Sequence, residues 1–112
     1  MEIQQPKDSD YLNDFERKHM PFVKEPVEVK QGAEVTITVN LGELDHPTIP
    51  EHYIKWVALY NGEEEIEKKR VGAGGENQVE FTFKADKEMV PRLLAECSIH
   101  GIWDNTFDLK VK

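Results

Sequence analysis

The segment Glu34-Val35-Thr36-Ile37-Thr38-Val39 alternates polar and apolar side chains without a break. A period of two puts the valines and the isoleucine on one face of a strand and the threonines on the other. The segment Gln78–Lys84 repeats this alternation with one valine and two phenylalanines. Both segments therefore predict antiparallel strands with one buried face.

A longer strand is predicted over His52–Tyr60. In this segment Ile54, Trp56, Ala58 and Tyr60 share one parity, which predicts that they form one inward face. Asn61-Gly62 follows directly and is a strong signal for a tight hairpin turn.

Four further stretches have the length and composition of short strands, and turn residues separate them: Phe22–Val29, Glu65–Val71, Arg92–Glu96 and Thr106–Val111. The glycine-rich segment 72–75 predicts a flexible loop directly after Glu65–Val71. A set of about seven short strands joined by turns predicts an all-β chain that folds as an antiparallel β-sandwich.

The N-terminal region differs from the rest of the chain. Residues 1–9 are polar and are expected to be flexible, and Ser9 or Asp10 is placed to cap a short helix through residues 11–15. A chain of 112 residues is long enough to bury one core without disulfides or structural metals. We therefore expect a single domain over 1–112 with a short N-terminal helix.

Composition excludes several classes of function. With 22 acidic and 14 basic residues the net charge is −8, which argues against nucleic acid as a partner. The N-terminus lacks the apolar core of a secretory signal, and no apolar run approaches the roughly 20 residues that span a bilayer. A single cysteine cannot form an internal disulfide and fits a reducing compartment. We expect a cytoplasmic protein with no membrane partner.

All four histidines and the only cysteine are candidate metal ligands, namely His19, His46, His52, Cys97 and His100. Structural zinc is satisfied by four ligands, usually with more than one cysteine. A set of five nitrogen and sulfur ligands favours a redox-active iron or copper with one coordination position left for a small molecule.

Each of these residues also has a structural interpretation. His46 precedes Pro47 and alone would be an ordinary loop histidine, and His19 alone would be a surface residue after a helix. His52 shares the parity of Ile54 and could be a core histidine. Cys97 and His100 are stronger candidates, because one tight turn can present both groups to the same ion.

The motifs around the candidate ligands resemble, in the same order, those of the one-iron superoxide reductases, also called neelaredoxins, which are related to the iron-binding domain of desulfoferrodoxin. The likeness extends from about Phe15 to the C-terminus. The motifs that carry it are Lys18-His19-Met20-Pro21, His46-Pro47, Glu51-His52-Tyr53-Ile54-Lys55-Trp56 and Cys97-Ser98-Ile99-His100-Gly101-Ile102-Trp103.

This resemblance implies an immunoglobulin-like sandwich and a mononuclear non-haem iron, one Fe(2+)/Fe(3+) per chain. It implies four imidazole ligands from His19, His46, His52 and His100 and an axial thiolate from Cys97. The reaction implied is reduction of superoxide to hydrogen peroxide, and Lys18 matches the family lysine that attracts the anion. An external donor such as rubredoxin would re-reduce the iron, and family members of this type are often homotetramers.

One position departs from the family pattern. Most relatives carry a glutamate directly before the lysine, and that glutamate closes the sixth position of the ferric ion. Here Arg17 stands at that position, and Glu16 is one residue earlier. In an extended loop Glu16 would point to the opposite side. We therefore predict that no glutamate of this segment binds the ferric ion.

Two other functions are compatible with parts of the pattern. A blue-copper electron carrier is also a β-sandwich, but it needs two histidines, one cysteine and usually a methionine after the second histidine. No methionine follows His100, and two histidines would be left over. The other alternative is a non-catalytic β-sandwich, either one that only binds a metal or an interaction module with incidental histidines. In metal analysis of the purified protein, iron supports the enzyme, copper supports the carrier, and absence of metal supports the interaction module.

Overall fold

The computed structural model describes residues 3–4, 13–23, 27–42 and 46–112, and within these ranges the chain is mostly strand. No helix in these ranges is long and apolar enough to cross a membrane. The elements are β1 (Ile3–Gln4), α1 (Asp14–His19), β2 (Val27–Val29), β3 (Glu34–Asn40), β4 (Ile54–Asn61), β5 (Glu64–Arg70), β6 (Gln78–Lys84), β7 (Pro91–Cys97), β8 (Gly101–Thr106) and β9 (Leu109–Val111).

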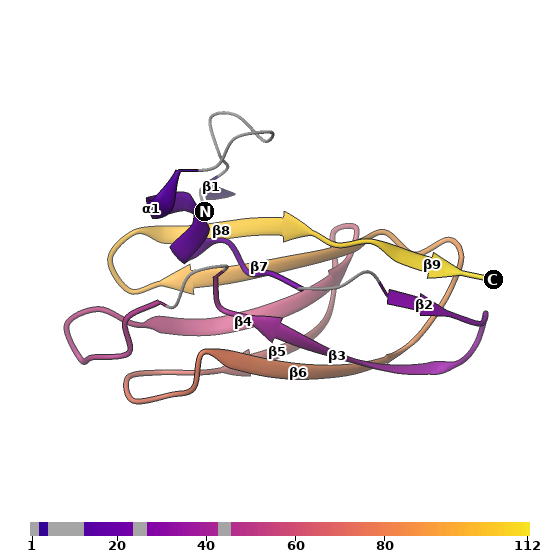
Figure 1. Cartoon of the computed structure of the whole chain (residues 1–112), viewed down its shortest axis with the longest axis horizontal. Helices are drawn as coiled ribbons and strands as arrows, with labels where there is room; N and C mark the ends of the chain where they lie inside the picture. The colour runs from indigo at the N-terminus through magenta and orange to yellow at the C-terminus, as the bar shows by residue number, and fades with distance from the viewer. Residues whose placement is uncertain (1–2, 5–12, 24–26, 43–45) are drawn as a thin grey trace.

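The strands form one large sheet and two strand pairs. The large sheet has the order β1-β8-β7-β4-β5, while β3 pairs with β6 and β2 pairs with β9. All pairings are antiparallel except β1 with β8 and β2 with β9. In Figure 1 the β2–β9 pair lies at one end of the molecule, and α1 lies at the other.

The β3–β6 pair and the large sheet share one hydrophobic core. Val35, Ile37 and Val39 are buried on β3, and Phe81 and Phe83 are buried opposite them on β6, as their alternation predicts. The core continues into inward-facing residues of the large sheet, namely Ile54, Val57, Leu59, Leu93, Ala95 and Cys97. Burial of each large side chain contributes about 1.5–3 kcal/mol. The core therefore extends directly to the thiol of Cys97.

The predicted inward face of β4 is wrong. Ile54 and Val57 belong to the core, whereas Trp56 is only half-buried on the opposite face. The cause is a β-bulge: Ile54 pairs with Cys97 and Trp56 pairs with Glu96, so that Lys55 is an extra residue on β4. One extra residue moves every side chain that follows it on the strand to the opposite face of the sheet.

The β4–β5 hairpin forms where Asn61-Gly62 predicts it, although the turn is shifted by one residue. Asn61 still pairs with Glu64, so the two connecting residues are Gly62 and Glu63. Gly62 has a φ of +61°, and no described residue other than glycine has a positive φ. This is the pattern of a type II′ turn, with glycine at its first position.

Two strand predictions need correction, and one strand is not predicted at all. The single predicted strand Thr106–Val111 is replaced by two strands, β8 (Gly101–Thr106) and β9 (Leu109–Val111). Of the predicted strand 22–29 only β2 is formed, Phe22 makes an isolated bridge with Asn40, and residues 24–26 lie outside the described ranges. The short strand β1 was not predicted and lies within the stretch 1–9, the rest of which is outside the described residues.

The helix α1 begins later than the sequence prediction. It spans Asp14–His19 and is capped by Asn13, whose side chain accepts a hydrogen bond from the Glu16 backbone N–H while the Glu16 carboxylate accepts one from the Asn13 N–H. This capping box fixes the first turn. The predicted caps Ser9 and Asp10 lie outside the described residues. Because residues 16–19 are helical, the assumption of an extended loop before His19 is wrong.

Candidate metal centre

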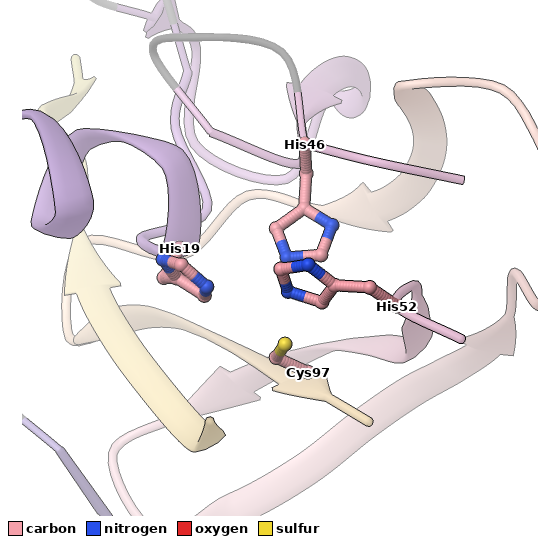
Figure 2. A group of neighbouring side chains, drawn as sticks. All are labelled: His19, His46, His52 and Cys97. Atoms are coloured by element: carbon pink, nitrogen blue, oxygen red, sulfur yellow. The ribbon is translucent and has the colours of Figure 1, made fainter. Parts of the chain in front are cut away.

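Four of the five predicted ligands meet at one point between α1 and the end of β7. The ligand atoms of His19, His46, His52 and Cys97 all lie within 4.8 Å of one another. Figure 2 shows the three imidazoles grouped above the sulfur atom of Cys97, which points toward them. These four residues come from four separate segments of the chain, so their convergence is a product of the tertiary fold.

The fifth candidate, His100, lies beside the same cluster. Its Nδ1 is 3.6 Å from the Cys97 Sγ and 3.0 Å from the His19 Nε2. Ring centroids are 4.9 Å apart for His19–His46, 4.6 Å for His46–His52, 5.0 Å for His52–His100 and 4.8 Å for His100–His19. The four imidazoles therefore form a closed ring of neighbours, with 6.0 Å between the centroids of His19 and His52 across it.

His19 is held at the end of α1. It is the last helical residue and is buried, and the ring centroid of Trp103 lies 5.7 Å from its own. The backbone of Met20, which caps the helix, donates to the Glu16 carbonyl. A short helix of six residues with fixed ends thus positions the imidazole. Lys18 precedes His19 in this helix, and its side chain is outside the described part of the structure.

His46 and His52 belong to the segment that leads into β4. The His46 backbone N–H donates to the Asn77 Oδ1 at 2.9 Å, which ties this segment to the one before β6. Ile49 and His52 exchange two backbone hydrogen bonds, which close a tight turn just before His52. Asn77 had not been identified from the sequence, where it carries no motif that distinguishes it from a loop residue.

Cys97 and His100 are presented by the hairpin between β7 and β8. Cys97 pairs with Gly101, whose φ of +85° allows the chain to reverse after the three residues between them. The Trp103 indole N–H donates to the His100 carbonyl at 3.2 Å. Ser98 and Tyr53 are joined by two hydrogen bonds, one from each backbone N–H. Ser98 and Tyr53 thereby attach the hairpin to the segment that carries His52.

The environment keeps two of the imidazoles neutral. The pKa of His46 is lowered to about 4, and burial is the largest cause. The hydrogen bond to the Pro47 carbonyl raises this pKa, and the neighbouring imidazoles lower it. Burial, with a smaller contribution from His100, also lowers the pKa of His52. A neutral imidazole is the form that binds a metal.

The hydrogen bonding of the same two residues fits a metal ion. The His46 Nδ1 lies 2.8 Å from the Pro47 carbonyl oxygen, which can only accept, so Nδ1 carries the proton and Nε2 the lone pair. The Nε2 atoms of His46 and His52 are buried and have no hydrogen-bond partner. Such atoms are costly unless something binds them. A metal ion bound by imidazoles and by the sulfur of Cys97 would give both Nε2 atoms a partner.

Comparisons with known proteins agree with this site. The Desulfoferrodoxin family model matches residues 11–106. The superoxide reductase of Pyrococcus abyssi is 34% identical in an alignment of 104 positions that covers 83% of this chain and 88% of that protein. The superoxide reductase (neelaredoxin) from Ignicoccus hospitalis has a similar structure, with a TM-score of 0.71 at 27% identity over 84% of this chain and 81% of the other. The reduced Archaeoglobus fulgidus neelaredoxin gives a TM-score of 0.62 at 25% identity, covering 87% and 96% of the two chains.

The fold and the site are those of a small, mostly β protein in which histidines and one cysteine are grouped to hold a metal ion. The extent of the sequence match identifies the family. This chain belongs to the desulfoferrodoxin family.

Proposed function

We propose that this protein is a superoxide reductase, an oxidoreductase that acts on superoxide. The observation that carries the proposal is the convergence of His19, His46, His52 and Cys97 on one point in a chain of this family. The net reaction joins superoxide with one electron and two protons to give hydrogen peroxide. An external donor supplies the electron that returns the centre to its reduced state.

The proposed cofactor is one iron per chain, held by His19, His46, His52, His100 and the Cys97 thiolate. Iron supplies one-electron chemistry and a position for a small anion when it is bound. The closed ring of four imidazoles, with the Cys97 sulfur beside it, would let these five residues hold one ion together. Four converging imidazoles weigh against a blue-copper carrier, which uses two.

The side chains around the centre control charge and water. Cys97, His19 and His46 are buried, so the thiolate and two of the imidazoles are shielded from solvent. A divalent ion with one thiolate and neutral imidazoles leaves a local charge of about +1, which attracts an anion despite the acidic surface because charges beyond about 8 Å are screened. Lys18 is proposed to add a second positive charge and to orient water for proton delivery.

We further propose the finer features that the family resemblance implies. The fold is an immunoglobulin-like β-sandwich with a short N-terminal helix, and it forms a single domain over residues 1–112. The electron donor is of the rubredoxin type, the protein acts in the cytoplasm, and it assembles as a homotetramer. The two layers of strands around one core support the sandwich assignment.

Iron content and absorption spectra test the function. The purified protein is expected to contain about one iron per chain, and the reduced form should consume superoxide in pulse radiolysis without releasing dioxygen. Copper in place of iron, or a protein that binds no metal, would contradict the proposal. Release of dioxygen would indicate dismutation instead of reduction.

A further inference from the structure

A second concave site lies on the outer face of the large sheet. It has a volume of about 620 Å³ and is lined by residues that include Tyr53, Lys55, Trp56, Lys68, Arg70 and Glu96. Three cationic side chains and one carboxylate surround a single indole. The chain as a whole is acidic, with a net charge of −8. This cavity, which we call the basic cavity, is therefore an electropositive site on an acidic protein.

The bulge on β4 builds the basic cavity. Because Lys55 is the extra residue opposite Glu96, both Lys55 and Trp56 lie against the same residue of β7. The Lys55 Nζ is 4.0 Å from a Glu96 carboxylate oxygen. A regular strand would direct Lys55 and Trp56 to opposite faces of the sheet. The bulge thus adds one cation to the two that β5 supplies.

Trp56 forms the centre of the basic cavity. Its indole N–H donates to the Glu96 Oε1 at 2.9 Å, which fixes the ring, and the Lys68 Nζ lies 4.3 Å from the ring centroid. Lys68 also approaches Glu65 at 3.7 Å. Arg70 pairs with Trp56 across the sheet and is exposed. A fixed aromatic ring framed by cations is typical of a protein-docking site.

Two residues that line the basic cavity are, along the chain, direct neighbours of candidate metal ligands. Glu96 directly precedes Cys97, and Tyr53 directly follows His52. The hydrogen bonds between Tyr53 and Ser98 link the two segments. Electron tunnelling weakens steeply with distance, so a redox group placed over this cavity is well coupled to the thiolate and to one imidazole.

We propose that the basic cavity is the docking site for the acidic face of a small electron-donor protein. The proposal rests on the proposed function, because it concerns the step in which the oxidised centre is reduced. The donor loses one electron and the metal centre gains it, and no proton is needed for this transfer. Carboxylates of the donor are expected to face Lys55, Lys68 and Arg70.

Charge complementarity selects this kind of occupant. An acidic donor is repelled by most of the surface, and screening over about 8 Å at physiological salt makes its orientation depend on local charge. The charged lining residues of the basic cavity sum to about +2, and Glu65 beside Lys68 reduces the net local charge to about +1. Such a patch directs the encounter and chiefly raises the association rate.

The test compares two double variants of equal charge. Lys68→Glu with Arg70→Glu reverses the basic cavity, and Lys30→Glu with Lys110→Glu reverses two exposed lysines that do not line it. Stopped-flow bleaching of the oxidised iron form is followed with a reduced, acidic rubredoxin as the probe, with ascorbate, and with hexaammineruthenium(II). The reaction of each pre-reduced protein with superoxide is measured separately.

The cavity variant is expected to react with rubredoxin about tenfold or more slowly than the control variant, a size typical of steering charges. Reduction by hexaammineruthenium(II) should be equal in the two. Equal rates with rubredoxin would overturn the proposal, since only the net charge would then matter. An equally large loss with ascorbate would also overturn it and assign the cavity to a small anion. Failure of the pre-reduced parent to react with superoxide would contradict the proposed function, while leaving the docking comparison readable.

Discussion

Ile54 of β4 lies directly opposite Cys97 of β7, and both side chains are buried. The next pair, Trp56 with Glu96, faces the other side of the sheet, because Lys55 is bulged between them. Two neighbouring residues of β7 therefore lie on opposite faces of the sheet, in different environments. Cys97 points into the core and the metal centre, and Glu96 points to the basic cavity. The position of the thiol is set by a paired strand and not by a loop.

Replacement of the thiol tests its assignment as a ligand. The oxidised iron form should be blue, from charge transfer between the ferric ion and the thiolate, and should bleach with ascorbate. Cys97→Ser should abolish the visible band. Ile99→Ala, in the same hairpin turn but exposed, should retain it. A Cys97→Ser protein with unchanged red-region absorption would show that sulfur is not a ligand.

Removal of the lysine next to His19 tests its role toward the substrate. Lys18→Ala should slow the reaction with superoxide by about ten- to a hundredfold, because one positioned charge contributes a few kcal/mol at most. Iron content should stay unchanged, and the rate should depend less on ionic strength than that of the parent. Pulse radiolysis at two salt concentrations measures both effects.

The matched control for this experiment is Lys110→Ala, an exposed lysine on β9 at the opposite end of the molecule from α1 (Figure 1). This variant should react at the parent's rate. If Lys18→Ala and Lys110→Ala behave alike, Lys18 is an ordinary surface residue.

Much of the core could be predicted because alternation is a local property. Val35, Ile37 and Val39 face inward as their parity requires, since β3 is regular along its whole length. The face of β4 could not be predicted, because the bulge at Lys55 depends on the partner strand and not on the sequence of β4 itself. The boundary between β8 and β9 was missed for a related reason, as β9 pairs with β2 and not within the large sheet.

The candidate metal ligands could be predicted from their residue types, but the hydrogen bonds that hold them in place could not. Histidines and a cysteine are rare enough in this chain to be noticed individually. Their supporting contacts involve common residues, such as Asn77 below His46 and the Ser98–Tyr53 pair, which only the tertiary structure brings together. The capping box of Asn13 and Glu16 was visible as a motif, but the helix had been assigned to an earlier segment.

The stability of the metal-free protein should depend on pH through His46. Its pKa is about 4 in the folded protein and 6.5 ordinarily, so between these values only the unfolded chain takes up a proton at this residue. Stability should therefore fall as the pH is lowered from 6.5 to 4, by about 3 kcal/mol for this group alone. Urea unfolding at pH 7 and at pH 4.5 measures the difference. His46→Gln lacks this titration and should lose clearly less stability over the same interval, and an equal loss would contradict the assignment.

The helical conformation of the segment before His19 decides where Glu16 lies relative to the metal ligands. Glu16 and His19 are three residues apart in α1, so they lie on the same side of it, and both are buried. The Glu16 carboxylate is nevertheless used in the capping box, where its Oε1 accepts from the Asn13 N–H at 3.0 Å. Arg17, at the position where most relatives have glutamate, lies 3.6 Å from the carboxylate of Asp14.

We therefore predict that no glutamate of this segment binds the ferric ion and that water or hydroxide takes the sixth position. Glu16→Gln tests this sharply, because glutamine preserves a capping box and cannot replace an anionic ligand. The absorption band of the oxidised variant should match that of the parent and of Asp14→Asn, a control in the same helical turn. A shifted band in Glu16→Gln alone would contradict the prediction. So would an oxidised crystal structure with a Glu16 oxygen about 2.0–2.2 Å from iron, the usual metal–carboxylate distance.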